Sequence, residues 1–285
     1  MEDFQRFIEE DVGRGDITSQ ALFKHERAKG VVFSRQKCIV AGLAETEGIF
    51  NKLNLKTEAL TRDGAQIKSG TKVLEIEGNI VNILKGERVA LNFLMRMSGI
   101  ATETKKLVDK CKKAKVRVVI AGTRKTVPGF RKYDKKAIEI GGGWPHRMDL
   151  HDGILIKDNH LKLISIAEAV RRTKFSGKRV EIEATNAKQA LEAAKVGAHI
   201  VMLDNMSSRK TRTVSKMLRK SYPKVKIEIS GGITPRNVLR YAPYADIISL
   251  GYLTHSSKAA NFSLEIEPQL EDQQKKRRRR RLRKT

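Results

Sequence analysis

Three short motifs between residues 123 and 160 decide the fold: Thr123-Arg124-Lys125-Thr126-Val127-Pro128-Gly129, Gly141-Gly142-Gly143-Trp144-Pro145-His146-Arg147 and Ile154-Leu155-Ile156-Lys157-Asp158-Asn159-His160. Each follows an apolar, strand-like run or contains a glycine turn, so its cations fall where parallel strands of an α/β protein end, the usual place of a ligand site. Arginine matches carboxylates and phosphates bidentately, and lysine adds a point charge. We therefore predict a pocket for a small ligand with several negative charges, formed by Arg124, Lys125, His146, Arg147 and Lys157; a solvated basic surface is the alternative.

Working outward from these motifs, short apolar runs alternate with helix patterns along the second half of the chain. The expected strands are 116–121, 153–157, 179–184, 199–203, 226–230 and 246–250, and the expected helices are 131–140, 160–173, 187–196, 207–221 and 235–242. This alternation is typical of parallel strands with helices outside them. Closing such a sheet gives a barrel with its chemistry at the carboxyl ends of the strands.

The first third of the chain is richer in strands. Residues 1–26 predict two short helices joined by a polar turn, and the region 28–81 predicts strands at 30–34, 37–40, 56–60 and 72–78 around a helix at 43–53, which indicates an α+β layer. Residues 81–113 form a long helical region. We expect Gly99 to interrupt it and Thr102-Glu103-Thr104 to restart a helix.

Acids and glycines follow the later strands of the second half. Glu181 and Glu183 share one face of a strand, and Asp204 ends the next one. These acids can hold a divalent metal, hydroxyls or a developing cation, or they can be neutralised by the surrounding Arg and Lys. The small residues Ser230-Gly231-Gly232 and Gly251 each open onto a helix, which lets backbone N–H groups wrap a phosphate.

Length and composition restrict the class of protein. The 285 residues are 40% hydrophobic, enough for a sizeable core in one large or two smaller domains. No apolar run approaches the ~18 residues that span a membrane, and the acidic start has no secretory signal. Two distant cysteines suit a reducing cytoplasm and give no zinc spacing. The net charge of +26 predicts attraction of either anionic substrates or nucleic acid.

The three motifs, in this order, resemble the quinolinate phosphoribosyltransferase family. The resemblance continues through Glu10-Asp11 with Gly15-Asp16-Ile17-Thr18, Glu87-Arg88-Val89-Ala90-Leu91-Asn92, Ser98-Gly99-Ile100-Ala101-Thr102, Glu181-Ile182-Glu183, Leu203-Asp204-Asn205-Met206, Ser230-Gly231-Gly232-Ile233 and Gly251-Tyr252-Leu253-Thr254-His255. It covers nearly the whole chain from Ile8 to about Ile266. One such motif is a weak signal, but this many in one order are highly specific.

The resemblance implies an α/β protein with an N-terminal α+β sandwich-like domain at 1–102 and an incomplete, six- to seven-stranded β/α barrel at 103–266. Six strands are readable here, and the seventh is expected near the triple glycine. Outside the resemblance, the run of like charges predicts a basic, disordered tail at 267–285. The implied reaction joins quinolinate to 5-phosphoribosyl pyrophosphate and releases pyrophosphate and carbon dioxide, giving nicotinate mononucleotide for NAD biosynthesis. The implied assembly is a cytoplasmic homodimer or hexamer with shared active sites, without a membrane partner.

The resemblance also implies a role for each site residue. Lys125, Lys157, Glu183 and Asp204 are the expected catalytic residues, and Glu183 and Asp204 are also the expected ligands of Mg²⁺. Phosphate binding is expected at Ser230, Gly231, Gly232, Gly251 and His255. The expected substrate ligands are Arg88, reaching across a dimer interface, with Thr123, Arg124, Lys125, His146, Arg147, Lys157, Glu183 and Asp204.

Two alternatives stay open. One is the molybdenum-transport-associated branch of the same superfamily; the intact Lys157-Asp158-Asn159-His160 and the full set of carboxylate ligands argue against it. The other is a basic nucleic-acid-binding protein; only 5% aromatic residues and no stacking motif argue against base readout. Residues 271–285 carry nine basic and two acidic residues, a net charge of +7. We expect this tail to be a solvated extension that binds nucleic acid non-specifically.

Overall fold

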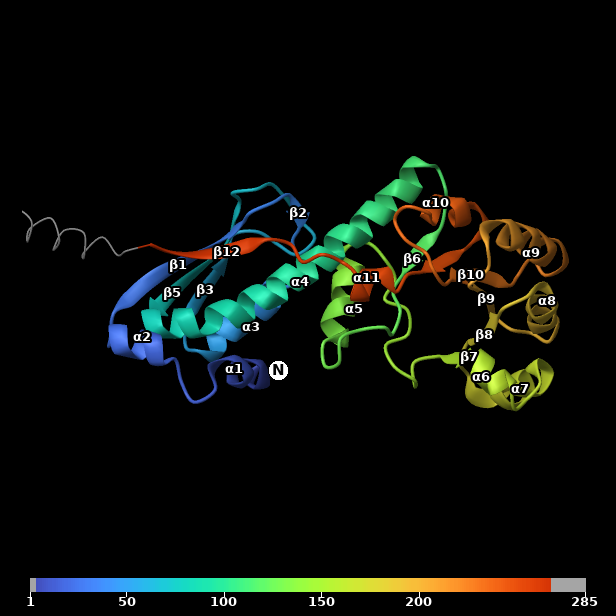
Figure 1. The fold of residues 1–285 in the computed structure, drawn as a ribbon, viewed down its shortest axis with the longest axis horizontal. Helices are drawn as coiled ribbons and strands as arrows, with labels where there is room; N and C mark the ends of the chain where they lie inside the picture. Colours follow the sequence, from blue (N-terminus) through green and yellow to red (C-terminus); the bar gives the residue numbers. More distant parts are fainter. Residues whose placement is uncertain (1–3, 268–285) are drawn as a thin grey trace, which may run out of the picture. The chain divides into compact units, whose positions relative to one another are not determined.

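The computed structural model describes residues 4–267, and their contacts divide the chain into two compact units. The first unit combines the residues up to Thr102 with those from Lys258 onward, and the second is Glu103–Ser257. Each unit has its own sheet structure, and Figure 1 labels most of the strands. Within residues 4–267, no helix has the length and apolar character needed to cross a lipid bilayer.

The first unit is built on an antiparallel sheet with strand order β12-β1-β5-β3 and a separate pair formed by β2 and β4. Phe4 and Phe7 pack edge-on against Phe93, with ring centroids 5.8 and 5.0 Å apart. The predicted α+β character is confirmed. The elements are α1 (Gln5–Val12), α2 (Ile17–Leu22), β1 (Arg27–Ser34), β2 (Cys38–Ile39), α3 (Leu43–Lys52), β3 (Lys56–Ala59), β4 (Gln66–Ile67), β5 (Lys72–Asn79) and β12 (Phe262–Glu267).

The long helix α4 (Ile80–Lys113) is continuous, so the predicted interruption at Gly99 is wrong. A Cβ atom at Gly99 would lie 2.2 Å from the carbonyl oxygen of Lys258, a distance that no real contact allows. The glycine therefore serves the close approach of another stretch of backbone to the helix and does not end it. Nothing in the local sequence distinguishes these two uses of glycine.

The last described strand returns to the first unit. The sequence-based division assigned residues up to 266 to the barrel, whereas β12 pairs antiparallel with β1, in a register that places Phe262 beside Ser34 and Glu267 beside Lys29. Side chains support the pairing, because Arg35 contacts both Ser263 and Glu265. The sequence of a strand does not identify the strand with which it pairs, so the sequence pattern did not predict that β12 pairs with β1.

The second unit is built on a parallel sheet with strand order β6-β11-β10-β9-β8-β7. The six predicted strands are all present, and the predicted α/β fold class is confirmed. Next to β6, Trp144 forms a parallel bridge with Ala121, and its backbone N–H donates to the carbonyl of Ile120 at 2.8 Å. This bridge lies beside the triple glycine, where the seventh strand was expected. The strands are β6 (Val119–Ala121), β7 (Ile154–Ile156), β8 (Val180–Ala184), β9 (Ile200–Asp204), β10 (Lys226–Ser230) and β11 (Ile247–Ser249).

Helices connect these strands and cover the outside of the sheet, as α7, α8 and α9 do in Figure 1. The predicted helix 160–173 is interrupted, because the hydroxyl of Ser165 accepts from the backbone N–H of Glu168 and caps a new helix there. The connections place the carboxyl ends of all strands at one edge of the sheet. The helices are α5 (Arg131–Ile140), α6 (Asp158–Leu161), α7 (Ile166–Thr173), α8 (Ala187–Lys195), α9 (Ser208–Ser221), α10 (Val238–Tyr241) and α11 (Tyr252–His255), with short 3-10 turns at Lys174–Ser176 and Ala242–Tyr244.

Candidate active site

A cavity of about 560 Å³ lies in the second unit, and its lining comes from the residues at and just after the carboxyl ends of the strands. Every site residue predicted in this unit lines it: Thr123, Arg124, Lys125, His146, Arg147, Lys157, Glu183, Asp204, Ser230, Gly231, Gly232, Gly251 and His255. Arg88 belongs to α4 in the first unit, where it is exposed. Its expected contribution to a neighbouring site stays a prediction.

One side of the cavity, here named the cationic wall, consists of Arg124, Lys125, His146, Arg147 and Lys157. Burial lowers the pKa of Arg147, and the nearby charge of Arg124 lowers it further. The Nε atom of Arg124 is buried, and no described residue accepts a hydrogen bond from it. Two arginines that repel each other, one with an unused buried donor, favour a ligand that brings negative charge between them.

Two acids face the cationic wall from adjacent strands. Glu183, in β8, is nearly buried and accepts a hydrogen bond of 2.7 Å from Lys157, which follows β7. Asp204 ends the next strand, β9, and accepts from the side chain of Asn205 at 2.6 Å. Each carboxylate keeps further lone pairs for other partners. Together they offer oxygen ligands of the kind that hard divalent cations and hydroxyl groups bind.

A second part of the lining, here named the glycine wall, consists of Ser230, Gly231, Gly232 and Gly251. Gly231 and Gly232 have φ values of +89° and +61°, in the left-handed region that side chains avoid. A Cβ at Gly231 would lie 2.7 Å from the backbone nitrogen of Asn205, whereas one at Gly232 would meet no atom within 4 Å. This backbone can therefore approach a phosphate closely and present N–H groups to it.

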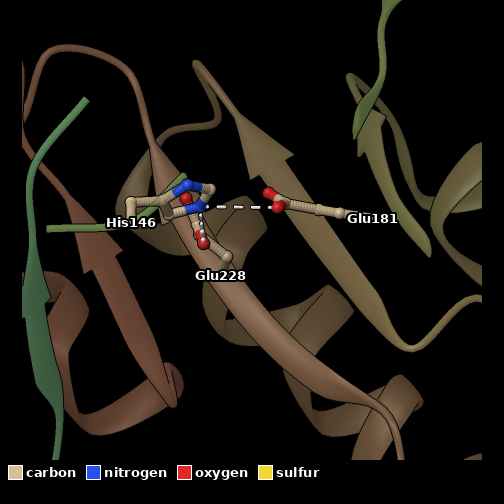
Figure 2. Close-up of side chains that lie close together, drawn as sticks. All are labelled: His146, Glu181 and Glu228. Atoms are coloured by element: carbon tan, nitrogen blue, oxygen red, sulfur yellow. Dashed lines mark hydrogen bonds and ion pairs between the residues drawn. The ribbon is translucent and has the colours of Figure 1, made fainter. Parts of the chain in front are cut away.

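Within the cationic wall, His146 contacts two acids, Glu181 in β8 and Glu228 in β10, the strands on either side of β9 (Figure 2). Its Nε2 atom lies 3.4 Å from a carboxylate oxygen of Glu181 and 3.2 Å from one of Glu228. The sequence analysis expected His146 in the site and counted Glu181 among the acids near the strand ends, but it assigned neither Glu181 nor Glu228 as its partner. The available signal was their position inside buried parallel strands, where a carboxylate without a partner is costly. Only the three-dimensional structure identifies that partner as His146.

Burial by itself lowers the pKa of His146, but the two acids raise it to about 9, while burial raises the pKa of Glu181. The backbone N–H of Arg147 donates to Nδ1 of His146 at 2.8 Å. Nε2 faces two carboxylates, so it carries a proton and has no free lone pair for a metal ion.

Comparisons with known proteins agree on one family. The family model for the quinolinate phosphoribosyl transferase N-terminal domain matches residues 16–98, and that for the C-terminal domain matches residues 100–265. A probable carboxylating nicotinate-nucleotide pyrophosphorylase of Methanocaldococcus jannaschii is 41% identical over 271 residues, which cover 92% of this chain and 95% of the relative. The human carboxylating nicotinate-nucleotide pyrophosphorylase is 34% identical over 84% of this chain and 82% of its own. The structure of the nicotinate-nucleotide pyrophosphorylase from Francisella tularensis has a TM-score of 0.86 at 34% identity, covering 92% and 94% of the two chains.

Proposed function

The chain belongs to the quinolinate phosphoribosyl transferase family, and from this premise we propose how its cavity works. The enzyme is a pentosyltransferase of NAD biosynthesis, a carboxylating nicotinate-nucleotide pyrophosphorylase like its relatives. It transfers phosphoribosyl from 5-phosphoribosyl pyrophosphate to quinolinate. The products are nicotinate mononucleotide, pyrophosphate and carbon dioxide.

The observation that carries the assignment of residues is the arginine pair of the cationic wall. Arg124 has an unused buried donor, and its charge lowers the pKa of Arg147. Quinolinate is a dianion whose two carboxylates lie on adjacent ring carbons. It can therefore remove the repulsion and satisfy the donor at once, while Lys125, His146 and Thr123 supply further contacts.

The glycine wall suits the sugar phosphate. We assign the 5-phosphate to the backbone of Ser230, Gly231, Gly232 and Gly251, with His255 beside them. In Gly251, a Cβ would approach Nε2 of His255 to 2.8 Å, so this glycine keeps the histidine close to the loop. Lys157 and Lys125 lie on the cationic wall, where they can meet the pyrophosphate.

Glu183 and Asp204 fit Mg²⁺, because this ion keeps several waters and needs only one or two carboxylates when phosphates complete its coordination. Bound there, Mg²⁺ would neutralise charge on the departing pyrophosphate. The same carboxylates lie where they can bind the ribose hydroxyls. The contact between Glu183 and Lys157, at 2.7 Å, holds the acid in place beside the cationic wall.

Catalysis then rests mainly on positioning and on fixed charge. As the bond from the anomeric carbon to pyrophosphate breaks, that carbon gains positive charge, which a nearby carboxylate of Glu183 or Asp204 stabilises. The ring nitrogen of quinolinate attacks the same carbon. The resulting positive ring accepts the electron pair of the bond to the adjacent carboxylate, so carbon dioxide leaves without an organic cofactor. The ring carbon that loses the carboxylate then takes up a proton from solvent, which gives nicotinate mononucleotide.

The assembly and compartment belong to the proposal as well. We assign Arg88 to the active site of a neighbouring subunit, so the active unit is a homodimer or a hexamer. Cys38 and Cys111 are buried free thiols, which suits a reducing cytoplasm. The tail was expected at 267–285; residues 268–285 lie outside the described residues, and their non-specific binding of nucleic acid stays a prediction.

One assay tests the function and the substrate together. Purified protein is incubated with 5-phosphoribosyl pyrophosphate, Mg²⁺ and either quinolinate or nicotinate, and the release of pyrophosphate and carbon dioxide is followed. We expect both products with quinolinate only. Equal turnover of nicotinate would show that the assigned substrate is wrong, and turnover of neither acid would favour the transport-associated branch of the superfamily.

A further inference from the structure

A lysine that takes no part in the proposed chemistry lies directly behind the cationic wall. Lys135, in α5, is completely buried, with an exposed fraction of 0%. It does not belong to the lining of the cavity. A buried ammonium group is costly unless hydrogen bonds compensate its lost hydration. Its presence therefore needs an explanation in terms of what it contacts.

The ammonium group of Lys135 contacts the loop that carries His146 and Arg147. Its Nζ atom donates to the carbonyl oxygen of Pro145 and, at 3.1 Å, to that of Arg147. These two carbonyls are the ones on either side of His146. That histidine has a φ of +59°, a conformation that costs free energy in a residue with a Cβ. Lys135 thus binds the loop on both sides of its strained residue.

The charges around Lys135 would favour a neutral side chain. Burial, followed by the charges of Arg131, Arg124 and Arg147, lowers the pKa of Lys135 to about 8, although Asp152 acts in the opposite direction. One turn earlier on the same face of α5, Arg131 donates to the carbonyl of Met148, at 3.4 Å, in the same loop. An apolar residue would relieve this repulsion but would leave the two loop carbonyls without their donor. The carbonyl contacts are the gain that offsets the burial of the charge.

We propose that Lys135 is a positioning residue for the substrate carboxylates: by binding the carbonyls of Pro145 and Arg147, it holds His146 in its left-handed conformation and directs Arg147 into the cavity. This inference rests on the proposed function of the cationic wall. It assigns no contact between Lys135 and either substrate. Its loss acts on quinolinate and leaves the glycine wall, which binds the other substrate, intact.

Kinetics of the full-length enzyme test the proposal with three variants. Lys135→Met keeps the length of the chain without its donors, Lys135→Gln keeps a neutral donor, and Lys132→Met changes an exposed lysine of the same helix. We expect Lys135→Met to raise the quinolinate KM roughly ten- to a hundredfold. Lys135→Gln should have an intermediate effect, and Lys132→Met none. The KM for 5-phosphoribosyl pyrophosphate should stay within about twofold in all three.

A pH profile separates positioning from a general loss of stability. Lys135 loses its proton as the pH rises through about 8, and the groups that face it are Arg131, Arg124, Arg147 and Asp152. The wild-type kcat/KM for quinolinate should therefore fall above that pH, and this alkaline limb should disappear in Lys135→Gln. If Lys135→Met does not fold, Lys135→Gln alone decides.

Two outcomes would overturn the inference. One is a folded Lys135→Gln enzyme with the wild-type quinolinate KM and the wild-type alkaline limb. The other is an equal rise of both KM values, which would show a merely structural role. A wild-type enzyme that does not turn over quinolinate would instead reject the proposed function itself, so the two failures are distinguishable.

Discussion

The cationic wall and the glycine wall face the same cavity but are built to bind anions in opposite ways. The cationic wall places its charge on side chains, and their positions depend on other side chains behind them, as His146 depends on Glu181 and Glu228. The glycine wall has no charged group, and its shape follows from a backbone conformation in which Gly231 has a φ of +89°. Removing one charged side chain leaves the rest of the cationic wall in place, whereas adding one methyl group distorts the backbone of the glycine wall. The two walls should therefore fail differently when mutated.

The largest effect is expected when the cationic wall loses both arginines. Arg124→Ala and Arg147→Ala should each raise the quinolinate KM about ten- to a hundredfold, because a charge-assisted hydrogen bond contributes about 1.5–3 kcal/mol. The double variant should lose about 10²- to 10⁴-fold in kcat/KM, reduced by coupling between the two neighbours. Steady-state kinetics with varied quinolinate measure this. Unchanged kinetics in both single variants would reject the carboxylate pocket.

A smaller effect, on the other substrate, is expected from Gly231→Ala. The added Cβ would be forced into a left-handed conformation and to within 2.7 Å of the backbone nitrogen of Asn205. The strain of about 1–2 kcal/mol corresponds to roughly a five- to thirtyfold rise in the KM for 5-phosphoribosyl pyrophosphate.

Gly142→Ala is the matched control for this strain. Gly142 has a φ of +84°, but its Cβ would meet no atom within 4 Å, and the residue does not line the cavity. The same backbone strain should therefore lower its thermal stability without changing either KM. Equal kinetic effects of both alanines would show that the glycine wall has no special role.

Mixing two inactive variants tests whether one chain contains all the residues of its active site. If Arg88 serves a neighbouring site, a hybrid dimer of Arg88→Ala and Lys157→Ala contains one intact site. Random exchange makes about half of the dimers hybrids, so activity should recover to at most about a quarter of the wild type. Subunit exchange is verified independently with differently tagged chains. Recovery that stays at the level of the separate variants, despite exchange, would locate Arg88 outside the shared site.

The smallest effect is expected from removal of residues 271–285. The described residues that line the cavity all lie between Gly122 and Ser256, so we expect kcat to stay within about twofold. Its net charge of +7 should still bind nucleic acid at low salt, and the amount that co-purifies should fall in the truncated protein. A large loss of kcat in a folded, truncated enzyme would show that the tail takes part in catalysis or assembly.

The alternation of apolar, strand-like runs with helix patterns predicted the sheet of the second unit. The residues that directly follow those runs predicted the lining of its cavity, because the lining lies at the ends of the strands. The runs that became β8 and β10 are apolar with inward acids, and the motif residues follow strands in sequence as well as in space. The family resemblance then supplied the roles of individual residues. These are features that a single chain shows along its length.

The features that the sequence did not predict share one physical cause: each is determined by a residue or strand that lies far away in the sequence. Gly99 is required by the carbonyl of Lys258, and β12 by the free edge of β1. Glu228 matters because it meets His146, and Lys135 because it reaches two carbonyls ten and twelve residues further on. Hydrophobic periodicity and intrinsic propensity describe the local preference of each residue and carry no information about contacts between residues that are distant in sequence.

Because β12 pairs with β1, the first unit can be completed only after the second unit has been synthesised. The sheet of the first unit lacks one edge strand until the ribosome has made the second unit, Glu103–Ser257, which takes about 10–30 s at usual elongation rates. Throughout that interval β1 presents an unpaired row of backbone donors and acceptors, a template for another nascent chain. The barrel unit can fold in that time, but the unit that begins the chain is finished last. A message cut short before Phe262 would leave this edge permanently open, so ribosome rescue and chaperone binding bear directly on the yield of active enzyme.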